Sequence, residues 1–218
     1  MRHVRVLVLA SLMLALTLGW AGYVVAGPIG SHSQGRSQAD RGQAENSAAY
    51  TSFHKMSDDS GSMSLEVPTA WSEVETGPWI YQGRVVGAFV AASPALDDFY
   101  ALRKTPGVFM AASHELADST DVAGLLGLEQ RKLTGKCKLK ERKAYTDAFY
   151  GGLSDAYVAC VNGQQDMLVI AATPPERDVL LLIRINRASD ADTVAIARIF
   201  KTFQVLGIPG HDDHHDHE

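Results

Sequence analysis

The last residues of the chain carry side chains that suit a transition-metal site. Four histidines, His211, His214, His215 and His217, are interleaved with four acidic residues after a Pro-Gly pair. Neutral imidazole and carboxylate are ligands for zinc, nickel and copper, and a flexible segment can wrap several of them around one ion. Chelation would reduce the conformational entropy of the segment, however, and charged termini also serve simply to keep a protein soluble. Residues 207–218 are therefore predicted to be a disordered tail and a candidate Zn, Ni or Cu site, with no other cofactor expected.

The chain has two cysteines, Cys137 and Cys160. Each lies near the edge of a predicted strand, so one bridge would join the segment before the last strands to one of those strands. In the chain-entropy model, closing a loop of about 24 residues makes such a disulfide worth about 3 kcal/mol. Two buried free thiols are the alternative, which a cytosolic protein would favour. We predict the disulfide because the N-terminus, described below, indicates export.

Residues 131–143 form the most basic stretch of the predicted domain. They contain one acid, Glu141, and seven basic residues: Arg131, Lys132, Lys136, Lys138, Lys140, Arg142 and Lys143. Such a stretch can attract an anionic lipid surface, an acidic wall polymer or an acidic partner protein. The alternative is a solvent-exposed edge strand whose lysines prevent pairing with another sheet. The sequence leaves both interpretations open.

No contiguous motif of the sequence indicates catalysis. It contains no Gly-x-Ser-x-Gly elbow, phosphate-binding glycine loop, Cys-x-x-Cys pair, or pair of histidines four residues apart on a predicted helix. His114 does not begin a zinc-protease motif, because the position four residues later is Asp118. Scattered carboxylates such as Glu115, Asp147 and Asp155 can still meet in a cleft, since paired catalytic acids need no local spacing. We nevertheless predict that the protein is not an enzyme.

The N-terminal residues resemble an export signal. Arg2 and Arg5 precede an uncharged apolar run, and small residues at Val24 and Ala26 suit cleavage after residue 26. Apart from one histidine, uncharged residues continue to position 35, so an uncleaved membrane anchor is the alternative for residues 1–26. Either outcome predicts a protein that is exported to the cell surface or beyond it.

Composition changes after this segment. Residues 27–62 are rich in Gly, Ser, Gln, Ala and Asp, and are predicted to be a flexible linker because they contain few large apolar groups. Removal of residues 1–26 would leave 18 basic and 25 acidic groups, since only Arg2 and Arg5 are lost. The mature chain is therefore mildly acidic, which argues against a general nucleic-acid binder.

Residues 63–206 have the length and composition of one globular domain. Alternating and continuous apolar patterns predict strands at these positions: 63–67, 79–82, 85–92, 108–112 and several within 136–185. The last strands are separated by turns too short for parallel crossovers, which predicts a four-stranded antiparallel meander. Helices are predicted after Ser93, from Asp118 and after Ser189, where capping residues precede an apolar face. The predicted fold class is α+β, an antiparallel β-sheet with helices packed on its faces.

Four aromatic residues lie on or beside predicted strands: Trp79, Tyr81, Tyr145 and Tyr150. Their spacing favours packing in the core, and the alternative is that they line a groove.

The order of these elements resembles the PsbP-like α/β sandwich. The resemblance lies in Met63-Ser-Leu-Glu-Val-Pro-Thr-Ala-Trp71, Gly87-Ala-Phe-Val-Ala-Ala-Ser93, Pro106-Gly-Val-Phe-Met-Ala-Ala-Ser113 and the run from Tyr145 to Cys160. It implies a non-catalytic binding or assembly module, of a kind sometimes joined to exported trypsin-like proteases or bacterial membrane kinases. The sequence thus favours an exported binding module whose partner is an unknown protein, a wall polymer or a membrane surface. The alternatives are a metal-handling surface protein and an accessory module for a separate exported protease or membrane kinase.

Overall fold

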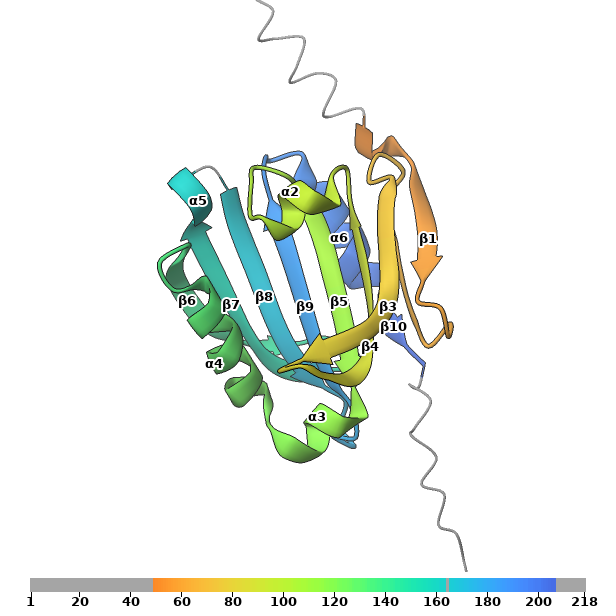
Figure 1. Cartoon of the computed structure of the whole chain (residues 1–218). Coiled ribbons are helices and arrows are strands. Elements are labelled where there is room, and N and C mark those ends of the chain that lie inside the picture. The colour runs from red at the N-terminus through yellow and green to blue at the C-terminus, as the bar shows by residue number, and fades with distance from the viewer. Residues whose placement is uncertain (1–48, 164, 207–218) are drawn as a thin grey trace, which may run out of the picture. The chain divides into compact units, whose positions relative to one another are not determined.

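A computed structural model describes residues 49–163 and 165–206 of the chain. Its main element is a seven-stranded antiparallel sheet, shown in Figure 1, with the strand order β3 (Glu73–Tyr81), β4 (Arg84–Ser93), β5 (Gly107–Ser113), β9 (Leu180–Arg187), β8 (Gln165–Thr173), β7 (Gly151–Ala159) and β6 (Lys138–Thr146). A second antiparallel sheet contains β1 (Phe53–Ser57), β2 (Met63–Pro68) and β10 (Gln204–Val205). The helices are η1 (Ala49–Thr51), α2 (Leu96–Tyr100), α3 (His114–Ser119), α4 (Val122–Leu133), α5 (Cys160–Gly163) and α6 (Asp192–Thr202).

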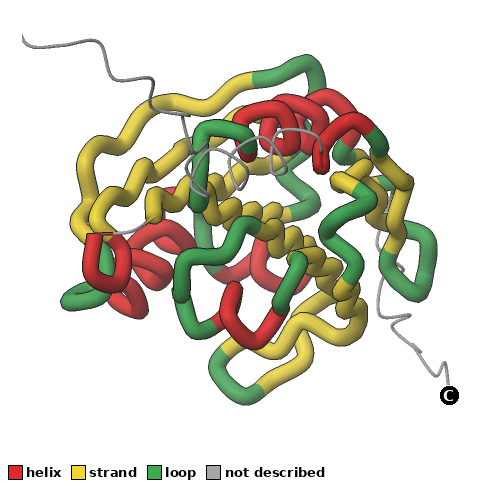
Figure 2. Tube along the Cα trace, turned by 90° about the horizontal axis from the view of Figure 1, so that it is seen from above, coloured by secondary structure: helices red, strands yellow, loops and turns green. Residues whose placement is uncertain are grey.

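The large sheet separates two apolar cores, because successive side chains of a strand point to opposite faces. On β9, Leu181 and Ile183 belong to the first core, whereas Leu180 and Leu182 belong to the second. The first core is closed by α6 and the small sheet, and the second by α3 and α4. Figure 1 shows α2 and α4 in front of the large sheet and α6 behind it, and the view from above in Figure 2 shows helical segments on both sides. The predicted fold class, an antiparallel sheet with helices on its faces, is confirmed.

The predicted meander is also confirmed. Strands β6, β7, β8 and β9 follow one another in the chain and pair antiparallel in that order. The last predicted helix is present as α6, and it begins at Asp192 with Ala191 as its N-cap, rather than directly after Ser189. The Asp192 carboxylate instead reaches back and accepts hydrogen bonds from the backbone N–H groups of Ala188 and Ser189, at 2.9 and 2.7 Å.

The predicted linker boundary at residue 62 is wrong. Residues Phe53–Ser57 form β1, which pairs antiparallel with β2, and Met56 of this strand is buried. Tyr50 donates a hydrogen bond to the Asp192 carboxylate at 2.5 Å and accepts one from the Trp71 indole at 3.2 Å. The segment is too polar to form a core of its own, but it folds because β2 supplies a pairing edge and the first core accepts its few apolar groups.

Two predicted helix starts are corrected as well. Ser93 does not cap a helix that begins with Pro94, since α2 begins at Leu96 and its N-cap is Ala95. The helix expected from Asp118 is two helices: α3 is capped by Ser113, and α4 is capped by Asp121, whose side chain accepts from the Gly124 N–H at 2.7 Å. Helix α2 has no side-chain cap, whereas α3 and α4 are capped by other residues than the one that local spacing suggested.

Several predictions fall outside the described residues. These are the export signal or anchor at 1–26, the linker up to residue 48, and the tail at 207–218. Within the described part of the chain, no helix is both long and apolar enough to cross a membrane.

Candidate functional site

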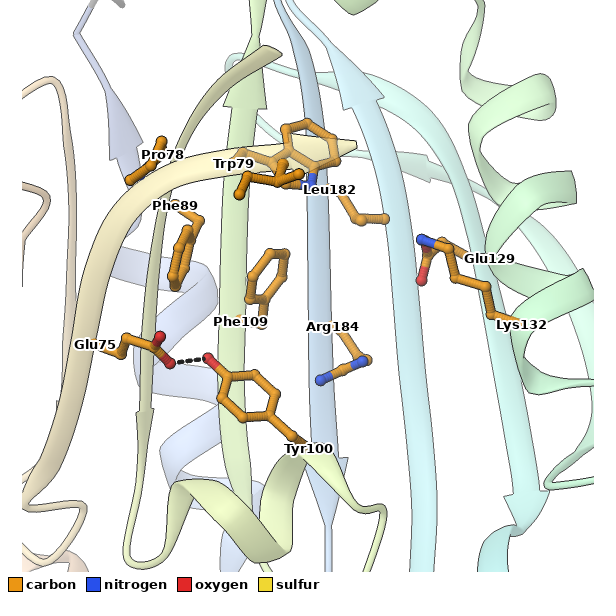
Figure 3. Close-up of a pocket in the computed structure, with 11 residues that line it drawn as sticks. Glu75, Pro78, Trp79, Phe89, Tyr100, Phe109, Glu129, Lys132, Leu182 and Arg184 are labelled. Carbon is orange, nitrogen blue, oxygen red and sulfur yellow. Dashed lines mark hydrogen bonds and ion pairs between the residues drawn. The ribbon is translucent and has the colours of Figure 1, made fainter. Parts of the chain in front are cut away.

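A cavity of about 380 Å³ opens on the α2 and α4 side of the large sheet. Six elements that are distant in the sequence line it: β3, β4, β5, β9, α2 and α4. Its lining includes four aromatic and four charged side chains; the charged ones are Glu75, Glu129, Lys132 and Arg184, as Figure 3 shows. The size lies within the usual range of small-molecule sites, about 300–1,000 Å³.

Strand β3 forms the roof of this cavity. It is an edge strand, and its pairing with β4 shifts register between Trp79 and Ile80. Such a bulge bends and twists a strand. The end of β3 therefore crosses over the sheet (Figure 3), which buries Trp79 to 5% exposure while Ile80 stays 63% exposed.

Helix α2 forms a second wall and is anchored by buried polar residues. The Asn186 amide donates to the carbonyl oxygen of Phe99 at 3.3 Å. The Gln165 side chain donates to the carbonyl oxygen of Leu102 at 3.0 Å and accepts from the Thr105 N–H at 3.3 Å. These bonds hold a helix of only five residues against the sheet, and so fix the position of the Phe99 and Tyr100 rings.

Arg184 occupies the floor of the cavity. It lies on β9, the central strand of the large sheet, at a position that faces the second core like Leu180 and Leu182. Its guanidinium Cζ lies 4.8 Å from the ring centroid of Phe99, 5.9 Å from that of Tyr100 and 5.8 Å from that of Phe109. Among the described residues it has no hydrogen bond and no ion pair, and its Nε is buried without a partner.

Burial lowers the pKa of Arg184, and the Glu129 carboxylate acts in the opposite direction. The guanidinium nevertheless stays charged, because the ordinary pKa of arginine is far above neutrality. Arg184 as a whole residue is half-buried, and a partly desolvated charge without an ionic partner is unfavourable, which contacts with aromatic rings offset only in part. The cavity thus contains one cation that the described residues leave without a hydrogen bond or an ion pair.

The other charged groups of the cavity are engaged. Glu129 is buried and accepts a hydrogen bond from the Lys132 ammonium at 2.5 Å, and this ammonium also lies 5.2 Å from the Tyr81 ring centroid. The Tyr100 hydroxyl donates to the Glu75 carboxylate at 2.6 Å, drawn as a dashed line in Figure 3. Burial, followed by this hydrogen bond, raises the pKa of Tyr100, so it stays a neutral donor. Arg184 is accordingly the group best placed to bind an anion here.

The two cysteines form the predicted disulfide. Cys137 precedes β6, Cys160 follows β7, and their sulfur atoms are bonded. The bridge and a hydrogen bond from the Val161 N–H to the Lys136 carbonyl oxygen, at 3.0 Å, join α5 to the start of β6.

The seven basic residues of the predicted patch differ in their partners within the chain, and attraction of an anionic partner by this stretch stays a prediction. Three of them have acidic partners inside the chain: Lys132 with Glu129, Arg142 with Asp155, and Lys143 with Glu141. Four make no ion pair within the described residues: Arg131, Lys136, Lys138 and Lys140. The strand β6 that carries most of them is an edge of the large sheet, as the alternative interpretation required.

The scattered carboxylates do not meet in a cleft. Glu115 of α3 forms an ion pair with Arg84. Asp147 accepts hydrogen bonds from backbone N–H groups of the turn between β6 and β7, and Asp155 of β7 binds Arg142. His114, in the first turn of α3, places its Nδ1 2.5 Å from the carbonyl oxygen of Asp178.

The four histidines of the tail lie outside the described residues. Within the described part of the chain, no group of three or more His, Cys, Asp or Glu side chains is arranged to hold a metal ion.

Sequence reasoning missed the role of Arg184. The available signal was an arginine at a core-facing position inside the apolar run Val179–Ile185, where a charge needs an explanation. Core packing was the expectation for the four strand aromatics, and Trp79, Tyr81 and Tyr150 are indeed buried. Trp79 in addition lines the cavity, so for this residue both interpretations hold.

No protein-family model and no curated protein sequence matches the chain. The structure is similar to the solution structure of cyanobacterial PsbP (CyanoP) from Synechocystis, with a TM-score of 0.43 and 14% sequence identity over 82% of this chain and 99% of that one. It is also similar to the crystal structure of the Saccharomyces cerevisiae Ran-binding protein Mog1p, with a TM-score of 0.39 and 12% identity over 71% of this chain and 96% of that one. A PsbP, from the family that the sequence resembles, is therefore among the structures to which this fold is similar.

Proposed function

We propose that this protein is an exported, non-catalytic binding module that holds a small organic anion against Arg184. The observation that carries the proposal is the Arg184 guanidinium itself, which lies in an aromatic cavity without a hydrogen bond or ion pair from the described residues. A bound anion would supply the counter-ion and the hydrogen bonds that the fold withholds.

The chemistry of the cavity supports binding rather than catalysis. Its two acids are committed, Glu129 to Lys132 and Glu75 to the Tyr100 hydroxyl. A general acid or base has to exchange its proton with a substrate, which a carboxylate held by a cation or a high-pKa phenol does poorly. Arg184 can only donate hydrogen bonds, which suits recognition of an anion.

Export is supported by two features. The N-terminal segment has the basic and apolar regions of an export signal. The Cys137–Cys160 disulfide is typical of proteins that fold in an oxidising compartment. N-terminal sequencing of the protein recovered from outside the cytoplasm tests this part of the proposal, with a chain that begins at Gly27 as the expected result.

Ligand binding can be tested with a pair of fluorescent probes that share an aromatic body. Anilinonaphthalene sulfonate carries one negative charge, and phenylnaphthylamine carries none. We expect Arg184→Gln to weaken binding of the sulfonate about tenfold or more, because a hydrogen bond to a charged group contributes about 1.5–3 kcal/mol. Binding of the neutral probe should change less than threefold.

The matched control is Arg187→Gln on the same strand. Arg187 lies three residues from Arg184 and pairs with Asp166 at 2.8 Å, away from the cavity. The Arg187→Gln substitution removes the same formal charge from the same strand and leaves the residues of the proposed site unchanged. Equal weakening of sulfonate binding by the two substitutions would contradict the proposal.

A further inference from the structure

We infer that the ligand of this cavity is a flat, monoanionic organic acid, with one carboxylate or sulfonate group close to an aromatic or similarly flat body. This inference rests on the proposed function and adds the charge and the shape of the ligand to it. Three features of the cavity carry it: its charges, the orientation of its rings, and the pair of residues Glu75 and Tyr100.

The charges favour a single negative group. Lys132 and Glu129 neutralise one another at 2.5 Å, which leaves Arg184 as the cation that can take a ligand anion. Glu75 and Glu129 both line the same cavity. A second negative charge on the ligand would therefore meet the Glu75 carboxylate and no further uncompensated cation among the described lining residues, and like charges in a partly buried site repel.

The rings favour a flat body. Phe89 and Phe109 are stacked on one another, with ring centroids 5.3 Å apart and an interplanar angle of 22°, so a further flat ring can extend this near-parallel arrangement. Trp79 covers the cavity from β3 (Figure 3). A planar molecule between these surfaces gains contact with both, as aromatic side chains do when they stack.

The distance between cation and rings limits the ligand further. The Arg184 Cζ lies 5.8 Å from the Phe109 ring centroid and 5.9 Å from that of Tyr100. A ligand that bonds to the guanidinium and stacks on Phe109 must carry its anionic group directly on its flat body or within a bond or two of it. A long-chain fatty acid does not meet this condition as well as an aromatic acid.

Glu75 is the specificity-determining residue in this scheme. It is exposed and holds the hydroxyl of Tyr100, which is 39% exposed, so the pair stands at the rim of the cavity. Its carboxylate adds negative charge beside the entrance. Because Coulomb energy is proportional to charge, Glu75 opposes entry of a dianion twice as strongly as entry of a monoanion.

Displacement of the bound sulfonate probe from the wild-type protein tests the inference. The competitors share a naphthalene body: naphthoate has one charge, naphthamide has none, and naphthyl phosphate has two at pH 8, since its second pKa is about 6. Low ionic strength limits screening at the rim. Naphthoate should bind about tenfold or more tightly than either of the other two compounds.

Glu75→Gln should reduce the difference in binding affinity between the monoanion naphthoate and the dianion naphthyl phosphate. Glutamine can still accept the Tyr100 hydrogen bond, so the rim keeps its structure. If loss of the Glu75 charge improves naphthoate binding about twofold, it should improve phosphate binding about fourfold, because the energies scale with charge. Glu176→Gln removes an exposed acid from the loop between β8 and β9, outside this cavity, and should leave the ratio unchanged.

The outcomes separate the inference from the proposed function. Sulfonate binding that depends on Arg184, together with equal affinity for naphthoate and naphthyl phosphate, would overturn the inference and leave the proposed function standing. Equal affinity for naphthoate and naphthamide would overturn the inference too. Sulfonate binding that does not depend on Arg184 would overturn both.

Discussion

Replacement of Arg142 with methionine should destabilise the protein far more than the same replacement of its neighbour Lys143. Asp155 lies opposite Arg142 in the pairing of β6 with β7 and is fully buried. Its carboxylate accepts hydrogen bonds from the Arg142 Nε and Nη2 at 2.6 and 2.7 Å, and one from the Tyr157 hydroxyl at 3.2 Å. Removal of Arg142 leaves this buried carboxylate without a cation.

The expected magnitude follows from the burial of each partner. Loss of one partner of a buried ion pair destabilises by about 3–5 kcal/mol. We discount this to about 3 kcal/mol for Arg142→Met, because the Arg142 side chain is 33% exposed and water can reach the site. For a domain of this size, that corresponds to a melting temperature about 6–12 °C lower.

Asp155→Asn should be less harmful, at about 1–2 kcal/mol, since Arg142 can turn toward water once its partner is neutral. The double variant should be no less stable than Arg142→Met alone. This non-additivity would give a coupling energy of about 1–2 kcal/mol in a double-mutant cycle.

Lys143→Met is the matched control, because it removes one positive charge from the next residue of the same strand. Its partner Glu141 is 41% exposed at the side chain and Lys143 is 66% exposed, so water screens the pair and its loss should change stability little. Urea unfolding followed by circular dichroism measures the free energy of unfolding of the four variants and of the wild type. The reasoning fails if Arg142→Met and Lys143→Met lower the free energy of unfolding equally.

Three further predictions concern other parts of the chain. Burial alone would raise the pKa of Asp58, but hydrogen bonds from Ser60, Ser62 and the Met63 N–H outweigh it and lower the pKa. The contribution of Asp58 to stability is therefore complete above the unfolded-state pKa of about 3.9. It is lost as the pH falls through the lower pKa of the folded state. Urea unfolding should accordingly show that Asp58→Asn destabilises the protein at pH 7 and much less at pH 2, and an equal difference at both pH values would contradict this. Reduction of the Cys137–Cys160 disulfide should lower the free energy of unfolding by about 3 kcal/mol, measured in thermal melts, while the domain stays folded at room temperature. An unchanged melting temperature would show that the bridge contributes little. Zinc titration should detect weak binding that disappears below about pH 6 and in a chain that ends at Gly210, and equal affinity of the shortened chain would rule out the tail as the site.

The sequence determined the features that depend on near neighbours. The alternating residues of β2, the apolar run of β5 and the Gly, Asn and Pro turns of the β6–β9 meander are local signals, because side-chain period and turn conformation are set within a few residues. The position of Cys137 and Cys160 at the ends of two paired strands followed from the same meander. The apolar face of α6 was also visible at helical spacing, although its first residue was not.

The tertiary structure alone decided which distant segments meet. The residues Phe53–Ser57 are too polar for their pattern to predict a strand. They form one because β2 offers a free edge with which their backbone can pair. Arg142 looked like part of a basic surface, but the register of β6 on β7 places it against a buried acid. Arg184 stands in an ordinary apolar run, and only the meeting of six elements shows that its charge faces aromatic rings without an ion pair from the described residues. Such pairings depend on contacts across the fold, which the spacing of residues along one segment does not encode.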